Sequence, residues 1–212
     1  MITALSLTET TRPIKLPPMS EGIVNGITVN VWVRRTGTSS RQRIIQFGTA
    51  TGEYFVLGTG DNASSLTIGI ERGATRSEMV CDGALPINRW VKVSAMWFPM
   101  FQLVSIAVFD ITLEQQSVGV FPTGPLVDIQ VAGGVAGNPF VGTLSDLEVL
   151  QLPVPNFFGA GDPAVVWGKY PLSSTAYQKT VTTNNVAVKY YSVPDIGPKN
   201  NSGVVTGELG QL

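Results

Sequence analysis

The chain has 212 residues, a formal net charge of −1 and only 14% charged residues, against the usual quarter. This balance gives no electrostatic basis for binding nucleic acid or an anionic membrane surface. The sequence contains no histidine and one cysteine, Cys81. Histidine-based triads, imidazole metal sites, internal disulfides and thiolate metal clusters are therefore excluded.

Apolar and polar residues alternate in many short segments separated by Gly-rich turns, the pattern of half-buried β-strands. The clearest segment is residues 27–35, where Ile27, Val29, Val31 and Val33 share one face. The predicted short strands, apart from a central pair, are residues 2–7, 13–16, 27–35, 44–47, 54–57, 66–71, 118–121, 127–131 and 143–150. Many short strands at regular spacing predict a two-sheet sandwich.

Residues 84–110 form the most apolar stretch, with no charge between Lys92 and Asp110. A membrane helix needs about 20 apolar residues, and this run is shorter and has Pro99 at its middle. We therefore predict two long antiparallel strands, with Pro99 in their connection because proline cannot donate to a ladder. In the first strand, one face consists of Val91, Val93, Ala95 and Trp97, and the other of Trp90, Lys92, Ser94 and Met96.

From residue 153 onward prolines interrupt the chain, and residues 178–192 have the pattern of a hairpin about Asn184-Asn185. We divide the chain into a sandwich, residues 1–153, and a C-terminal arm, residues 154–212. The arm carries aromatic residues suited to docking on a neighbouring subunit, namely Phe157, Phe158, Trp167, Tyr190 and Tyr191. The alternative is that the arm folds back over an open sheet edge of its own sandwich.

Four segments in order resemble the concanavalin A-like, laminin-G-like jelly rolls. They are ALSLTETTRPIKLPP, ITVNVWVRR, LPINRWVKVSAMW and FVGTLSDLEVLQLP, spanning residues 4–153. The resemblance implies an all-β, two-sheet antiparallel jelly-roll sandwich, here with an extended C-terminal arm. It also implies that Trp32 and Trp90 pack between the sheets. Thr8 and Glu9 replace the family's Asp-Gly pair, and Lys92 replaces its usual histidine. The resemblance therefore supports the fold more strongly than it supports any of the family's binding sites.

Laminin-G-like folds often bind calcium through loop acids and carbonyls, and no other cofactor is expected. The candidates for a Ca²⁺ site are Asp61, Asn62, Asp82 and Asp128. Turn chemistry accounts for Asp and Asn at these positions equally well.

Asp146 and Glu148 are predicted to share a strand face, about 7 Å apart. That separation falls in the range of inverting glycosidases, and some glucanases of this fold use acids in an E-x-D-x-x-E pattern. The third acid is missing here, so we interpret the pair as solvent-facing and predict no catalytic residues.

Arg34, Arg35, Arg41 and Arg43 flank one hairpin loop and form the only local positive cluster. We expect either a solvated rim or a contact with an acidic partner.

The first functional hypothesis is a non-enzymatic adhesion or structural subunit of a large assembly, such as a phage virion protein in capsid decoration or tail and host binding. The second is a free glycan-binding, lectin-like module, and the third a glycoside hydrolase of the same fold. The expected partners are protein subunits, including copies of this chain, and cell-surface glycan, without nucleic acid or membrane insertion. Residues 1–18 lack a secretory signal, so we expect synthesis in the cytoplasm and incorporation into a virion or similar particle.

Overall fold

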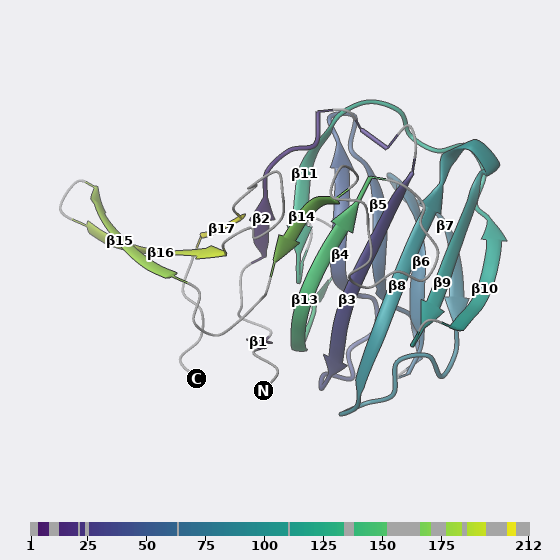
Figure 1. The fold of residues 1–212 in the computed structure, drawn as a ribbon, viewed down its shortest axis with the longest axis horizontal. Helices are drawn as coiled ribbons and strands as arrows, with labels where there is room; N and C mark the ends of the chain where they lie inside the picture. Colours follow the sequence, from purple (N-terminus) through teal and green to yellow (C-terminus); the bar gives the residue numbers. More distant parts are fainter. Residues whose placement is uncertain are drawn as a thin grey trace.

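The structure is a computed structural model in which two antiparallel sheets pack face to face as an all-β sandwich (Figure 1). It describes residues 4–8, 13–20, 22–23, 26–62, 64–109, 111–133 and 138–151, and the strands at residues 166–170, 177–183, 186–193 and 203–206. Helical structure in this part of the chain is nowhere long and apolar enough to cross a membrane.

Sheet A is built around the two predicted central strands. Its strand order is β1 (Leu5–Leu7), β13 (Gly142–Leu150), β3 (Ile27–Arg35), β8 (Trp90–Phe98), β9 (Leu103–Val108) and β10 (Ile111–Ser117), and β14 (Val166–Tyr170) also pairs with β13. The connection between β8 and β9 is a single 3₁₀ turn, Pro99–Phe101. The predicted antiparallel pair and the place of Pro99 are thus confirmed.

Sheet B forms the second layer. Its strand order is β15 (Tyr177–Thr183), β16 (Val186–Val193), β17 (Gly203–Thr206), β2 (Ile14–Leu16), β11 (Leu126–Val131), β4 (Gln42–Thr49), β5 (Glu53–Thr59), β6 (Leu66–Arg72) and β7 (Thr75–Cys81), and the short β12 (Asn138–Pro139) pairs with β4. Apart from the parallel β12–β4 contact, the neighbouring strands are antiparallel.

The core lies between the sheets and follows the predicted alternation. The inward residues of β3 and β8 are all buried, with Val31 directly opposite Val93. Trp97 is fully buried, donates its indole N–H to the Gly69 carbonyl at 3.3 Å, and meets the Phe47 ring edge-to-face at 6.0 Å. This side chain therefore joins sheet A to sheet B.

The expectation that Trp32 and Trp90 pack between the sheets is wrong. Both are only half-buried and lie on the outer face of sheet A. Because strand side chains alternate in direction, the inward position of Val91 requires Trp90 to face outward. The core tryptophan is Trp97, seven positions further along the same strand.

Two details of the strand prediction also differ. Strand β7, Thr75–Cys81, was not predicted because four of its seven residues are polar or charged. The strand predicted at residues 118–121 is absent, and residues 111–117 form β10 instead. Phe121 is nevertheless buried, stacked on Phe55 with ring centroids 5.8 Å apart.

Strands of the C-terminal arm lengthen both sheets of the same chain. Val149 of β13 pairs with Gly168 of β14, and Ile14 of β2 pairs with Val205 of β17. The predicted hairpin is confirmed as β15–β16, which extends away from the sandwich at the left of Figure 1. These pairings favour the alternative in which the arm covers open edges of its own sandwich.

The aromatic residues proposed for assembly fall outside what the structure describes in detail. Phe157 and Phe158 lie outside the described residues, and for Trp167, Tyr190 and Tyr191 only the strand positions are described. Their role in assembly stays a prediction.

Replacing Trp97 by alanine should lower the free energy of unfolding by about 3–5 kcal/mol, because it removes a large buried ring from the contact between the sheets. The half-buried Trp90 is the matched control, and Trp90→Ala should cost no more than about 1–2 kcal/mol. Urea unfolding followed by circular dichroism measures both. Equal losses for the two variants would contradict the assignment of Trp97 as the core tryptophan.

Deleting residues 154–212 should lower the melting temperature and promote aggregation, because the deletion leaves unpaired the part of β13 that pairs with β14 and the edge of β2 that pairs with β17. Deleting only residues 207–212, which follow β17, is the control and should leave the melting temperature unchanged. Thermal unfolding and light scattering check both. A truncated sandwich that melts normally but no longer self-associates would instead support the assembly role of the arm.

Candidate functional site

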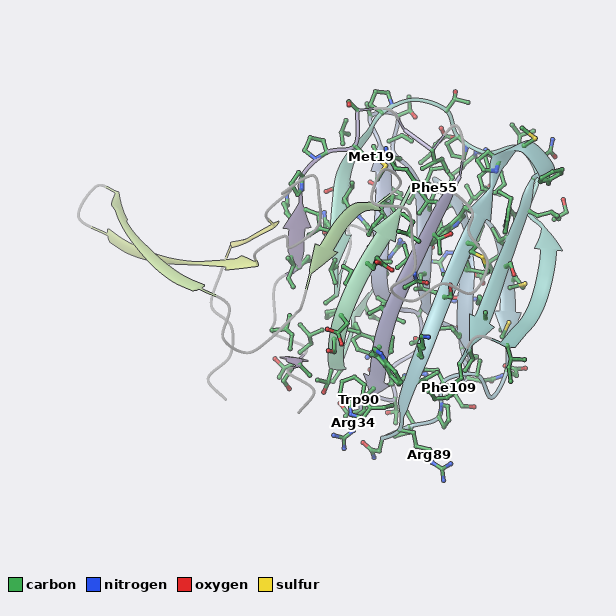
Figure 2. All side chains as sticks on the ribbon, viewed as in Figure 1. Met19, Arg34, Phe55, Arg89, Trp90 and Phe109 are labelled. Atoms are coloured by element: carbon green, nitrogen blue, oxygen red, sulfur yellow. The ribbon has the colours of Figure 1, made fainter. Side chains whose placement is uncertain are left out.

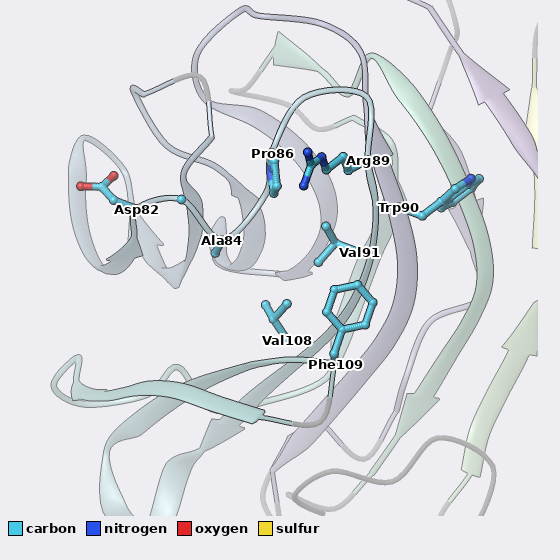
Figure 3. Close-up of a pocket in the computed structure, with 9 residues that line it drawn as sticks. Asp82, Ala84, Pro86, Arg89, Trp90, Val91, Val108 and Phe109 are labelled. Atoms are coloured by element: carbon cyan, nitrogen blue, oxygen red, sulfur yellow. The ribbon is translucent and has the colours of Figure 1, made fainter.

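A cavity of about 460 Å³ opens at the end of the sandwich where β8 begins and β9 ends (Figure 3). Its walls come from the loop between β7 and β8, from the first residues of β8, and from Val108 and Phe109 at the end of β9. Small-molecule sites in proteins have volumes of about 300–1,000 Å³. We call this cavity the end pocket.

The β7–β8 loop is held by backbone contacts to other parts of the chain. The amide of the fully buried Leu85 donates to the Ser64 carbonyl at 2.8 Å. Asn88 has a positive φ of 61°, and its amide donates to the Arg35 carbonyl at 2.8 Å. Because these bonds anchor the loop at two points, the wall of the end pocket is formed before any ligand arrives.

The inner surface of the end pocket is apolar and has one aromatic wall. Ala84 and Val91 are buried, and Val108 packs against the core. Phe109 is 50% exposed and meets the Trp32 ring edge-to-face at 6.0 Å. A single aromatic surface beside buried aliphatic groups suits a ligand with an apolar face.

Phe109 has an unusual backbone conformation, with φ of 50°. Its amide is held by the Lys92 carbonyl at 2.9 Å. A left-handed conformation costs a residue other than glycine on the order of 1–3 kcal/mol, and such residues are enriched at functional sites. Phe109 is one of six described residues other than glycine with a positive φ. The conformation places the Phe109 ring at the pocket, where Figure 3 shows it beside Val91.

Charged groups lie on the rim of the end pocket. Arg89 and Asp82 are both exposed, and the Oδ1 atom of Asp82 accepts a hydrogen bond from the Asn62 amide at 3.0 Å. Figure 3 shows the Arg89 side chain directed toward Pro86, whereas the Trp90 indole points to the opposite side of β8. Trp90 therefore contributes to the outer face of sheet A, opposite Arg34 of β3.

The structure does not bring the four predicted arginines together. Arg35 is buried and holds its own loop, donating to the carbonyls of Gly37, Ser39 and Asn62 at 2.8, 2.7 and 3.3 Å. Its burial lowers the pKa of Arg35. Of the remaining three, Arg34 lies in β3 opposite Trp90, on the face of sheet A that is turned away from the end pocket.

Arg41 and Arg43 belong to a polar network on the outer face of sheet B. Arg41 binds Glu78 at 2.8 Å and Asp61 at 2.7 Å, and these hydrogen bonds, the one to Glu78 first, raise the pKa of Arg41. Arg43 forms a buried ion pair with Glu71. The hollow over this network has a volume of only about 20 Å³, room for about one water molecule.

The four residues predicted to bind calcium do not lie together at one site. Asp61 and Asp82 lie near Asn62 at one end of the sandwich, and each accepts a hydrogen bond from a neighbouring side chain. Asp128 lies in β11 and accepts from the amides of Gln46 and Gln130 at 3.2 and 2.6 Å. Within the described ranges, no three His, Cys, Asp or Glu side chains are grouped so that they could hold a metal ion.

The acid pair of β13 is interrupted by a β-bulge. The register to β3 shifts between Ser145 and Glu148, and Asp146 has φ of 50°. Asp146 is exposed, whereas Glu148 is buried and accepts a hydrogen bond from the Asn30 amide at 3.1 Å. The predicted i, i+2 spacing on one strand face is wrong, because a bulge inserts an extra residue into the alternation.

Two pocket residues, Phe109 and Arg89, were not predicted from the sequence. Phe109 ends the long uncharged stretch, and Arg89 precedes the predicted central strand. Nothing in the alternation pattern indicates that a left-handed residue would turn the Phe109 ring toward the β7–β8 loop.

The order of strands in the two packed sheets defines a jelly-roll β-sandwich of the concanavalin A-like kind. No family model and no curated protein matches the sequence. Solved structures do match, all at low sequence identity. The likeness therefore concerns the fold alone.

One similar structure is a putative carbohydrate binding protein from Bacteroides ovatus, with 16% identity and a TM-score of 0.64. The alignment covers 99% of this chain and 61% of that protein, so the chain spans about three fifths of its length. A second is the CBM40 of the Ruminococcus gnavus IT-sialidase bound to α2,3 sialyllactose, with 11% identity, coverage of 73% and 95%, and a TM-score of 0.53. A third is domain 4 of a Geobacillus stearothermophilus extracellular arabinanase in complex with arabinotriose, with 14% identity, coverage of 65% of each chain, and a TM-score of 0.51.

Proposed function

We propose that this protein is a non-catalytic carbohydrate-binding module and that the end pocket holds its ligand. The observation that carries the proposal is the half-exposed Phe109 ring, which forms one wall of a cavity of about 460 Å³ with Arg89 and Asp82 on its rim. Sugar rings have apolar C–H faces that pack on aromatic rings, and hydroxyl groups that bind charged planar side chains. The end pocket supplies both kinds of surface.

The similar structures support the proposal that the ligand is a carbohydrate. The Bacteroides protein is described as a carbohydrate binding protein, and the two other domains were solved with sialyllactose and arabinotriose bound. These ligands belong to those proteins. They are a reason to test sugars first on this chain.

Glycan binding was the second functional hypothesis from the sequence. Nothing in the similar structures bears on the first one, a virion subunit with an assembly arm, and that assignment stays a prediction. The finer resemblance to laminin-G-like domains, and a Ca²⁺ site with it, stays a prediction as well.

Mutating Phe109 to alanine should weaken glycan binding about tenfold, because stacking on one aromatic ring contributes about 1–1.5 kcal/mol. A glycan array identifies the ligand, and isothermal titration calorimetry measures the dissociation constant. Phe101, 65% exposed in the β8–β9 connection at the other end of these strands, supplies the matched control Phe101→Ala. Equal weakening by both variants, or an array without any bound glycan, would contradict the proposal.

We also propose that the module does not cleave its ligand. Glu148 is buried against Asn30 and Asp146 is exposed on a bulge, so the pair lacks the paired arrangement that glycosidases use. Incubation with β-glucans and other polysaccharides should release no reducing ends. Turnover that Asp146→Asn or Glu148→Gln abolishes would show that the chain is an enzyme.

A further inference from the structure

We infer that the end pocket recognises a methyl group on its sugar, carried as an N-acetyl or a 6-deoxy substituent, and that Ala84, Val91 and Val108 hold this methyl group. The inference rests on the proposed glycan-binding function and specifies the chemical class of the glycan.

The first observation is the composition of the pocket lining. Of the nine residues that line the end pocket, only Asp82, Arg89 and Trp90 have a polar atom in the side chain, and the Trp90 indole points to the opposite side of β8. The other six, which we call the apolar lining, are Gly83, Ala84, Pro86, Val91, Val108 and Phe109. Asp82 and Arg89 are exposed on the rim. The polar side chains therefore lie at the opening, and the apolar lining forms the inner surface.

The second observation concerns the backbone around the end pocket. Pro86 has no amide N–H to donate. The Phe109 amide already donates to the Lys92 carbonyl at 2.9 Å, and the Leu85 amide in the β7–β8 loop donates to the Ser64 carbonyl at 2.8 Å. These amide groups are therefore engaged within the protein before a ligand binds.

The third observation is how the apolar lining is supported. Val91 is 2% exposed and Ala84 is 8% exposed, and Val108 packs against the core. Figure 3 shows Val91, Val108 and the Phe109 ring around the same space, and Figure 2 shows Phe109 at the end of the sandwich. A sugar whose face packs on the Phe109 ring would present one edge to these aliphatic groups.

The chemistry of that sugar edge selects the ligand. A hydroxyl group placed against the aliphatic side chains would lose its hydrogen bonds to water and gain none from them, which disfavours binding. A methyl group gains from the same burial. The hydroxyl groups that remain at the opening can accept from Arg89 and donate to the Asp82 carboxylate. The end pocket thus suits a sugar with a methyl group on one edge and hydroxyl groups on the other.

The test compares sugars that differ at the methyl group. N-acetylglucosamine is paired with N-formylglucosamine, and N-acetylgalactosamine with N-formylgalactosamine, because the formyl compounds lack only the methyl. L-fucose is paired with L-galactose, which has a hydroxymethyl group in its place. Calorimetric or NMR titration measures the dissociation constants, and saturation-transfer NMR should give its strongest signal on the methyl protons of the bound sugar.

The pairs also distinguish the two sources of the methyl group. If the source is an acetamido group, an N-acetyl sugar should bind about fourfold more tightly than its N-formyl counterpart, the gain for one buried CH₂ group. If the source is a 6-deoxy group, L-fucose should bind about tenfold more tightly than L-galactose, because burial of a hydroxyl group is avoided as well.

Variants of the apolar lining locate the methyl group. Val108→Thr replaces a methyl by a hydroxyl group of similar size, and it should remove most of the preference for the methyl-bearing sugar. Ala84→Ser introduces a hydroxyl group from the β7–β8 loop and should act in the same direction. Val127→Thr makes the matched change at a 50% exposed position of β11 in sheet B and should have no effect. Melting temperatures of the three variants check that each is folded.

The outcomes separate this inference from the proposed function. If the members of every pair bind equally, if the glycan preferred on the array has no methyl group, or if Val127→Thr lowers the preference as much as Val108→Thr does, the inference is overturned while glycan binding stands. If none of these sugars binds and a wider glycan array is also negative, the proposed function fails and the inference fails with it.

Discussion

The packing of Trp97 between the two sheets is the contact on which the rest of the structure depends. Its ring fills the space between sheet A and sheet B, and its indole N–H satisfies the Gly69 carbonyl of β6. Once Trp97 faces inward, the alternation along β8 fixes the direction of every other side chain in that strand. Val91 becomes part of the apolar surface of the end pocket, and Trp90 and Lys92 are left on the outer face.

The charged side chains of sheet B and those at the end of sheet A differ in burial and in their partners. On sheet B, Arg43 and Glu71 lie on neighbouring parts of a broad face and are both buried, so each needs the other. Removing one partner would leave an uncompensated buried charge, which is strongly destabilising. At the end of sheet A, neither Arg34 nor Arg89 forms an ion pair within the described residues, and Asp82 lines the same pocket as Arg89. The Arg43–Glu71 pair is thus buried within the fold, whereas Arg89 is exposed at the end pocket.

Much of the fold could be predicted from the sequence because alternation is a local property. The faces of β3, β8 and β9 and the hairpin β15–β16 follow from neighbouring residues alone. The prediction for Trp90 relied on family resemblance against its own alternation, and the alternation was correct. The prediction for Asp146 and Glu148 used alternation where a bulge interrupts it, and a bulge has no clear signal in the residues around it.

The site was harder to predict because it is made by distant segments and unusual backbone. Asp82 meets Asn62, twenty positions earlier, and Phe109 approaches the β7–β8 loop only through a left-handed φ. The four arginines are close in sequence, yet successive strand residues point to opposite faces and Arg35 turns into its own loop. Spacing along the chain therefore suggested a cluster that the sheet geometry separates.

The pairing of β17 with β2 has a consequence for how the chain folds. Val205 of β17 is the register partner of Ile14 in β2. These two paired strands are therefore separated by nearly the whole length of the sequence. β1 and β13 are similarly remote, with Leu5 opposite Leu144. Contacts at such large sequence separation give a high contact order, and sandwiches of this kind fold in milliseconds to seconds or more slowly. During synthesis on the ribosome, the edge of β2 that pairs with β17 stays open until β17 emerges. An open strand edge can pair with another chain, so late synthesis of β17 prolongs the exposure of this edge to misassembly.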